Sequence, residues 1–207
     1  MFVALEVLSL PLYILSGLAR RRRLLSQEAS LKYFLLGAFS SAFFLFGSAL
    51  LFGYSGSLDL SVIAKAIGTR SGMDGLLVPG VLLVLVGLLF KIGAVPFHSW
   101  TPDVYQGAPT PVTGFMAACT KVAAFGAILR FVYVGVADSR WDWAPGLWAV
   151  AILTMVVGAA LSITQTDIKR LLASSSSAHA ASVLTGLRAP HHAGSPAALL
   201  SPVSSRV

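Results

Sequence analysis

Long apolar runs alternate with short polar segments along this chain. Five of the runs are close to the roughly 20 residues that an α-helix needs to cross the hydrocarbon core of a bilayer. They cover residues 1–19, 33–53, 76–95, 111–134 and 147–164. A sixth run at residues 171–187 is interrupted by a run of four serines and by a histidine, so the pattern leaves its spanning role open. The pattern predicts an all-α, polytopic transmembrane helical bundle.

The composition and the placement of charge agree with a membrane protein. Of the 207 residues 56% are hydrophobic and 11% charged, and the mean hydropathy is +0.81, whereas soluble domains carry about 25% charged residues. The net charge is +7, but four arginines at 20–23 directly follow the first run and Lys32 precedes the second. Because such positive loops lie in the cytoplasm, we interpret the charge as topological and expect no nucleic-acid partner. Alternation then places the loops at 96–110 and 167–170 inside, and those around residue 65 and at 138–143 outside.

The single cysteine, Cys119, lies within an apolar run, so this chain can form neither a disulfide framework nor an iron–sulfur cluster. We therefore expect no cofactor in the chain, and any redox chemistry must lie in partner subunits. A cleavable signal peptide carries its positive charge before the apolar segment. Here the arginines follow it, which favours a retained span at residues 1–19.

Lys91 lies near the end of the third run, five residues before Pro96. A charged side chain at the bilayer centre costs roughly 2.5–3.5 kcal/mol, so an ionisable residue in a span indicates function. Pro96 lacks an N–H and clashes with the carbonyl of Ile92, which predicts a discontinuous helix just past the lysine. Freed carbonyls at this depth need protein or water beside them, and that favours a proton relay. The alternative is that Lys91 snorkels to the interface.

Lys121 lies near the middle of the fourth run. Small residues share its expected helical face, namely Gly114, Ala117, Ala118 and Ala124. Such a face packs against other helices and not against lipid. Burial favours the neutral form of a lysine and a nearby carboxylate favours the charged form, so a movable counter-charge would let Lys121 load and release a proton. An inert lysine paired with a carboxylate is the alternative.

Glu6 is the carboxylate best placed to serve these lysines, because Ser9 and Tyr13 extend a polar stripe along its helical face. It could equally lie at the aqueous end of the first run. His98 follows Pro96 by two residues, and its ordinary pKa near 6.5 would let it pass protons at physiological pH. His98 and His179 could also act only as hydrogen-bonding groups. Asp103 is expected to be a turn residue or helix cap.

The stretch from residue 90 to 113, FKIGAVPFHSWTPDVYQGAPTPVT, closely resembles the signature of the antiporter-like N subunits of proton-pumping NADH–quinone oxidoreductase, respiratory complex I. The resemblance extends to residues 4–11, 31–38, 121–125 and 167–173. Related subunits of multisubunit sodium/proton antiporters share the lysines and the broken helix. They usually differ in the loop after the break, where YQGAPTP at 105–111 favours the N type.

The resemblance implies an antiporter-like fold of inverted repeats, each with a discontinuous helix, around a proton channel. Glu6 matches a glutamate that pairs with the lysine of the broken helix, here Lys91. Lys121 matches the lysine that passes the proton toward the middle of the subunit, and His98 matches a histidine near the proton uptake path.

The family pattern ends near residue 187, so we expect a partial antiporter-like domain at 1–187 and a disordered, non-family tail at 188–207. Prolines at 190, 196 and 202 prevent that tail from spanning a membrane. The chain is less than half as long as full members, which predicts a truncated or frameshifted reading frame without the terminal-half lysine.

The resulting hypothesis is a membrane subunit of NADH–quinone oxidoreductase that contributes to proton translocation coupled to electron transfer from NADH to quinone. Its partners would be other membrane subunits, the lipid bilayer and protons, with FMN, iron–sulfur clusters and quinone held elsewhere in the complex. Abundant Ala, Gly and Arg hint at a bacterial plasma membrane. The alternatives are a subunit of a cation/proton antiporter or membrane hydrogenase, and a non-functional fragment.

Overall fold

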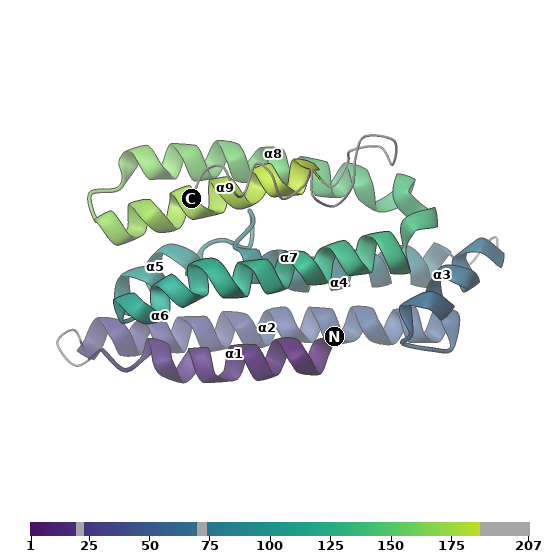
Figure 1. Ribbon diagram of the computed structural model, residues 1–207, viewed down its shortest axis with the longest axis horizontal. Coiled ribbons are helices and arrows are strands. Elements are labelled where there is room, and N and C mark those ends of the chain that lie inside the picture. The colour runs from purple at the N-terminus through teal and green to yellow at the C-terminus, as the bar shows by residue number, and fades with distance from the viewer. Residues whose placement is uncertain (20–22, 70–73, 187–207) are drawn as a thin grey trace.

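The computed structural model describes residues 1–19, 23–69 and 74–186, which form helices joined by short connections (Figure 1). Within these ranges no residue is in a β-strand. The all-α prediction is therefore confirmed. The predicted tail at 188–207 lies outside the described residues, and so do residues 20–22 of the arginine cluster.

The helices run approximately parallel or antiparallel and stack in layers (Figure 1). In chain order they are α1 (Phe2–Ser16), α2 (Arg23–Ser55), α3 (Leu60–Thr69), α4 (Asp74–Ile92), α5 (Trp100–Gly107), α6 (Thr110–Phe115), the π-helix η2 (Met116–Thr120), α7 (Lys121–Arg130), the π-helix η3 (Phe131–Gly135), the 3-10 helix η4 (Ala137–Ser139), α8 (Arg140–Thr164) and α9 (Ile168–Gly186). Helix α2 packs against α1 on one side and α4 on the other, α4 packs against α7, and α9 packs against α8 and α5.

Four helical segments within the described ranges are long and apolar enough to cross a membrane: Arg23–Ser55, Gly75–Ile92, Thr110–Gly135 and Ala137–Thr164. Helix α1 is apolar but has 15 residues. The serine-rich sixth run forms α9, a 19-residue helix that lies along α8. The 33 residues of α2 extend about 50 Å, so its polar N-terminal part projects beyond a hydrocarbon core of about 30 Å.

The discontinuous helix consists of α4 and α5, and Gly93 ends its first half. Gly93 has φ +72°, its N–H donates to Phe90 O (3.0 Å), and the next N–H, of Ala94, donates to Leu89 O (3.1 Å). This pair of bonds is the Schellman motif, in which a left-handed residue caps the last carbonyls of a helix. The break therefore begins three residues before Pro96, whose peptide bond with Val95 is cis.

The expectation of a loop across residues 96–110 is wrong for residues 100–107, which form α5. Trp100 and Val104 are one turn apart and both are buried, so the segment has an apolar face that rewards helix formation. Pro102 is compatible with this helix because it lies in the first turn, where a backbone N–H has no intrahelical partner. Asp103 is consequently a helical residue of α5 and not part of a turn.

The segment around Lys65, which we expected to be a loop, contains α3. Leu60, Ile63 and Ile67 recur at helical spacing, Ile63 is buried, and the helix packs on η3 and η4. This apolar stripe is too short to be distinguished in the sequence from a polar connection.

The polar connections lie at the two ends of the bundle in the pattern that alternation requires. At one end, Lys32 on α2 and Arg170 on α9 both contact Asp103 on α5. At the other end, α3 contacts η4, which precedes α8. The segments assigned by charge to one side of the membrane therefore meet at one end of the molecule (Figure 1).

Candidate functional site

Glu6 and Lys91 come from different helices and face one another. Glu6 Oε1 on α1 lies 3.9 Å from Lys91 Nζ on α4, and the two side chains are 22% and 10% exposed. Ser41 on α2 donates a hydrogen bond of 2.5 Å to the same Glu6 oxygen. The three residues line a small pocket between α1, α2 and α4. Glu6 is thus an inward-facing carboxylate in contact with an intramembrane lysine.

Lys91 also binds two hydroxyl groups of the polar stripe on α1. Its ammonium donates to Ser9 Oγ at 2.7 Å and to the Tyr13 hydroxyl at 3.4 Å. Ser9 in turn donates to the backbone carbonyl of Leu5 at 2.7 Å. Ser9 thus accepts a hydrogen bond from Lys91 while its own O–H is bonded to a backbone carbonyl. With Glu6, Ser9 and Tyr13 as partners, Lys91 is held between α1 and α4.

Close helix packing positions Lys91. Gly87 lies one turn before the lysine on α4, and a Cβ built there would be 2.7 Å from Phe44 Cβ of α2. Ser40 on α2 donates to the Gly87 carbonyl at 3.2 Å. The glycine therefore lets α2 approach α4 at the level of the ion pair, as small residues do at membrane helix interfaces.

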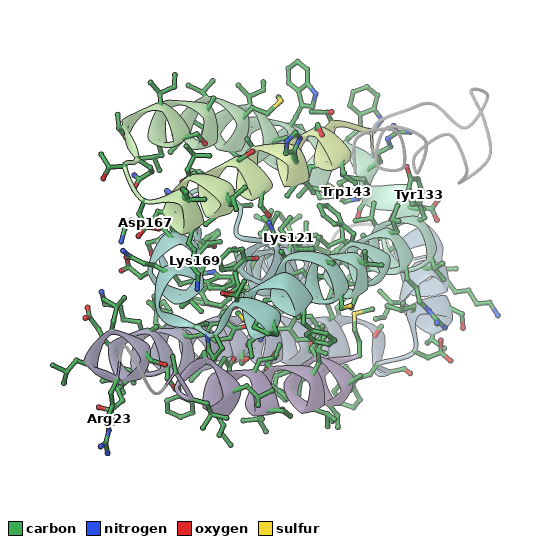
Figure 2. All side chains as sticks on the ribbon, turned by 60° about the vertical axis from the view of Figure 1, so that its left-hand side comes forward. Arg23, Lys121, Tyr133, Trp143, Asp167 and Lys169 are labelled. Carbon is green, nitrogen blue, oxygen red and sulfur yellow. The ribbon has the colours of Figure 1, made fainter. Side chains whose placement is uncertain are left out.

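Lys121 is 7% exposed and donates a hydrogen bond to Ser176 Oγ on α9. Figure 2 shows it in the interior of the molecule, between α7 and α9. Among the residues that the structure describes, no carboxylate forms an ion pair with it. The structure thus gives Lys121 a neutral partner and not the counter-charge that an inert ion pair requires.

The predicted small-residue face around Lys121 is partly wrong. Ala124 is buried, but Gly114 and Ala118 are exposed. The reason is η2, whose wider turn immediately before Lys121 shifts the helical phase, so that Met116 lies on the buried side. A period of 3.6 residues cannot anticipate this shift, and π-turns of this kind are frequent at functional sites.

His98 lies in the break between α4 and α5, as predicted. Partial burial lowers the pKa of its imidazole below the ordinary value, and the nearby Pro96 carbonyl opposes this shift. The buried Nδ1 has no hydrogen-bond partner of good geometry. His179, by contrast, is exposed on α9, one helical turn after Ser176.

Two further polar atoms beside the break have no hydrogen-bond partner, namely Thr101 Oγ1 and the Tyr105 hydroxyl. Thr101 is 1% exposed and Tyr105 is 2% exposed. A buried unpaired hydroxyl costs about 1–3 kcal/mol, so each such group requires an explanation.

Asp103 joins three helices at the end of the bundle nearest α5. Its carboxylate oxygens lie 2.8 Å from Lys32 Nζ on α2 and 2.7 Å from Arg170 Nη1 on α9. Partial burial raises the pKa of the Asp103 carboxyl, but the hydrogen bonds and positive charges of Lys32 and Arg170 outweigh burial and leave the pKa below its ordinary value. Asp103 therefore fixes α5, the second half of the discontinuous helix, to α2 and α9. We call its two ion pairs, with Lys32 and with Arg170, the clamp.

A second link reinforces this clamp. Gln106 of α5 donates to Asp167 at 3.1 Å, and Asp167 accepts the backbone N–H of Lys169 at 2.8 Å at the start of α9. Lys169 reaches back to the carbonyl of Ala108 at 3.0 Å. Figure 2 labels Asp167 and Lys169 where the α8–α9 connection meets α5.

The structure thus unites Glu6 with Lys91, and it places Lys121 against α9 with its own partner. Sequence reasoning anticipated the Ser9 and Tyr13 stripe but missed Ser41 and Ser176. A signal for both was present, because serines are adjacent within apolar runs at 40–41 and at 174–177.

Fold and site together define a class of protein: a polytopic helical membrane protein with buried lysines on both sides of a broken helix. The chain belongs to the NADH:quinone oxidoreductase/Mrp antiporter transmembrane family, whose family model matches residues 1–201.

Individual relatives match over almost the whole chain. NADH-quinone oxidoreductase subunit N of Beutenbergia cavernae is 71% identical over 187 residues, which are 90% of this chain and 35% of that protein. A chain of respiratory complex I from Thermus thermophilus, solved with bound aureothin, is 46% identical with a TM-score of 0.76, over 90% of this chain and 39% of that one. A chain of the Mrp complex from Dietzia sp. is 27% identical with a TM-score of 0.78, over 90% and 34%. The chain thus spans about a third of the length of its curated relatives.

No group of three or more His, Cys, Asp or Glu side chains that could hold a metal ion occurs among the described residues. The chemistry that this site supports is the transfer of protons between amine, carboxylate, imidazole and hydroxyl groups.

Proposed function

We propose that this chain is part of a membrane subunit of NADH–quinone oxidoreductase and contributes to proton translocation coupled to electron transfer. The observation that carries the proposal is the Glu6–Lys91 contact beside a broken helix, with a second buried lysine, Lys121, on the next long helix. A buried amine whose partners include a carboxylate and hydroxyl groups can bind a proton and later release it. The lysine side chain stays inside the protein throughout.

In this proposal Glu6 and Lys91 form the first proton-exchanging pair and Lys121 receives the proton further along. Movement of Glu6 away from Lys91 would remove the charge that stabilises its ammonium form, and the ammonium would then lose its proton. His98 exchanges protons with the aqueous phase at the break. The 71% identity to a subunit N supports the assignment to NADH–quinone oxidoreductase.

The experiment uses a chimaeric subunit in which residues 1–186 replace the matching segment of the Beutenbergia cavernae subunit, within the assembled complex in liposomes. We expect Lys91→Ala and Lys121→Ala each to reduce proton pumping by about tenfold or more, because each removes a proton-exchanging group. NADH oxidation with an artificial electron acceptor should be unchanged, because the electron carriers lie in other subunits.

Lys65→Ala is the matched control, because Lys65 is an exposed lysine on α3 outside the long spans. It should pump like the unmodified chimaera. Undiminished pumping by both the Lys91 and the Lys121 variants, in normally assembled complex, would contradict the proposal.

A second candidate function is a subunit of a multisubunit cation/proton antiporter. The likeness to the Mrp complex chain favours it, with a TM-score of 0.78 at 27% identity. The experiment that separates the two is co-purification of the full-length protein with its neighbours. Recovery with NADH-oxidising subunits supports the first function, whereas recovery with antiporter subunits alone supports the second.

The surroundings of the chain follow from the first proposal. The protein is a multi-pass membrane protein, and we place it in a bacterial plasma membrane beside other membrane subunits of the complex. The single cysteine of this chain cannot hold an iron–sulfur cluster. In this proposal the clusters, FMN and the quinone site therefore belong to other parts of the complex. The partial-domain boundary at residue 187 and the tail beyond it stay a prediction.

A further inference from the structure

Tyr13 on α1 supplies a hydroxyl ligand to the ammonium of Lys91. The ammonium lies 2.7 Å from Ser9 Oγ and 3.4 Å from the Tyr13 hydroxyl, whereas Glu6 Oε1 lies 3.9 Å away. The two hydroxyls are therefore nearer to the charge than the carboxylate is. Tyr13 is 4% exposed, so bulk water does not replace its hydroxyl. The position of the Tyr13 ring consequently affects which groups hold the ammonium.

Gly37 on α2 leaves the space that the hydroxyl end of Tyr13 occupies. A Cβ built on Gly37 would overlap the Tyr13 hydroxyl oxygen and lie 2.7 Å from Tyr13 Cζ. Because real Cβ atoms essentially never approach another heavy atom this closely, a larger residue at position 37 would displace the Tyr13 ring or push α1 away from α2. Either change would move the hydroxyl relative to Lys91.

Tyr33 fixes the orientation of the same ring. It lies one helical turn before Gly37 on α2, so the two residues share a face of that helix. The Tyr33 ring meets the Tyr13 ring edge to face, with ring centres 4.6 Å apart and planes at 79°. This is one of the arrangements that aromatic pairs prefer. Helix α2 therefore contacts Tyr13 along its ring through Tyr33 and at its hydroxyl end through Gly37.

Trp100 at the start of α5 supports Tyr33. The two rings are stacked, with centres 4.8 Å apart and planes at 17°. Trp100 also stacks on Phe90 of α4 at 5.4 Å, and its Nε1–H donates to the Phe90 carbonyl at 3.0 Å. Phe90 directly precedes Lys91 along the chain. Trp100 thus fixes Tyr33 relative to the part of α4 that carries Lys91.

We call Tyr33, Gly37 and Trp100 the tyrosine socket, since the first two contact Tyr13 and the third supports Tyr33. We propose that the tyrosine socket positions the Tyr13 hydroxyl against Lys91 and thereby sets how the ammonium is shared between Glu6 and the hydroxyls of α1. A ring that its neighbours hold in one rotamer keeps its hydroxyl in place, whereas a loosely packed ring visits other rotamers. The proposal rests on the proposed function and adds to it three positioning residues, which act through Tyr13.

The first test compares substitutions that keep a ring with substitutions that remove it, in the chimaeric subunit. Tyr33→Leu removes the ring that orients Tyr13, and we expect the pumping rate per assembled complex to fall by about fivefold, because a misplaced group lowers a rate even when it is present. Tyr33→Phe keeps the ring and should restore most of the rate. Trp100→Leu and Trp100→Phe form a second pair, in which the leucine variant should be the more impaired.

Gly37→Ala tests the space at the hydroxyl end of Tyr13. The added Cβ meets the Tyr13 ring, so pumping per assembled complex should fall to a similar extent. Gly126→Ala is the matched control, because the same change on α7 meets nothing within 4 Å, and this variant should pump normally. If the Gly37 variant does not assemble, the Tyr33 pair decides. Equal pumping by Tyr33→Leu and the unmodified chimaera would overturn the proposal.

A double variant separates positioning from general packing. Tyr13→Phe removes the hydroxyl alone, and pumping should fall because Lys91 loses one of its ligands. If Tyr33 acts through that hydroxyl, adding Tyr33→Leu to Tyr13→Phe causes no further loss, since the two changes then interrupt the same contact. A further loss as large as that of Tyr33→Leu alone would show that Tyr33 acts through packing elsewhere, and it would refute the socket.

Lys91→Ala separates this proposal from the proposed function. If that variant loses pumping while Tyr13→Phe and Tyr33→Leu keep it, the socket is refuted and the proposed function stands. If Lys91→Ala and Lys121→Ala both pump normally in assembled complex, the proposed function fails, and the role of the socket fails with it.

Discussion

Gly93 determines where the discontinuous helix breaks. Its φ of +72° lies in the left-handed region, and its missing side chain leaves space for Thr101 Oγ1 and Ser177 Oγ. The helix break predicted from Pro96 occurs where we expected it. Pro96 is not its whole cause, because Gly93 has already ended α4 at Ile92. The sequence does not show which glycine of an apolar run will adopt a positive φ. A proline, by contrast, always lacks its N–H and has a restricted φ, so its effect on a helix can be predicted.

Gly93→Ala should destabilise the folded subunit by about 1–2 kcal/mol from backbone conformation alone. The added Cβ would also press on Thr101 Oγ1, so α5 must shift. Gly126→Ala is the control, because a Cβ there meets nothing within 4 Å and the residue is interior to α7. The measurement is the thermal unfolding midpoint of the chimaeric complex in detergent. Equal midpoints for the two variants would contradict this account of the break.

Single residues also show how far the site could be predicted. The polar stripe of Glu6, Ser9 and Tyr13 was visible because three polar residues recur at helical spacing in an apolar segment. Their contact with Lys91 could not be derived from spacing, since 85 positions of chain separate Glu6 from Lys91 and only packing brings them together. The polar stripe made Glu6 the candidate carboxylate for the two lysines, and the family resemblance assigned it to Lys91 in particular.

At the scale of elements, the short helix α5 depends on charged contacts with neighbouring helices. It has eight residues, and helices so short are marginal alone. Asp103 fixes it to α2 through Lys32 and to α9 through Arg170. The sequence showed these charges but not their partners, because the three helices are far apart along the chain.

Asp103→Asn should weaken this clamp by about 1 kcal/mol, since the ion pairs are partly exposed. The pKa of Asp103 lies below its ordinary 3.8 in the folded protein, so its stabilising effect is present above that value and is lost as the pH falls through the lower, folded value. The unmodified complex should therefore lose more stability over this acidic interval than the Asn variant does. Thermal unfolding midpoints measured from neutral pH down through this interval test the difference.

Glu28→Gln is the control for the clamp, because it removes a more exposed ion pair of the same lysine. Glu28 pairs with the same Lys32 at 2.7 Å, but it is 56% exposed and belongs to the same helix. Its loss should change the midpoint less than Asp103→Asn does. A larger effect at Glu28 would show that tethering α5 is not the source of the stability.

For the whole molecule, hydropathy and charge were sufficient to predict the helical class and the positions of its long apolar segments. Each span is a continuous run whose burial in lipid does not depend on its neighbours. Helices α3 and α5 escaped prediction because each depends on contacts with other helices. The π-turn η2 escaped it because a hydrophobic period of 3.6 residues does not reveal a wider turn. The outer faces of α1 and α2 carry exposed apolar side chains such as Val3, Ile14 and Phe39, as a surface that meets lipid or other helices requires.

The arrangement of the two ends yields a test of membrane topology. Arg23, labelled in Figure 2, is exposed at the end where α2 begins, and Thr166 is exposed at the same end, where α8 meets α9. Lys65 and Asp138 are exposed at the end of α3 and η4. The arginines at 20–23 predict that the first end is cytoplasmic. In a cysteine-free chimaeric subunit with Cys119→Ser, single cysteines at these four positions provide the labelling sites.

An impermeant maleimide added outside intact spheroplasts should label the cysteines at 65 and 138, and those at 23 and 166 only after the membrane is opened. The physical reason is that the polar segments at the two ends are separated by spans that no hydrophilic reagent crosses. Labelling all four positions alike in intact spheroplasts, or labelling 23 and 138 as one set, would contradict both the charge assignment and the arrangement of ends. Reversed labelling of the two sets would keep the arrangement and refute the orientation, which would then place Asp103 and its clamp on the outer face.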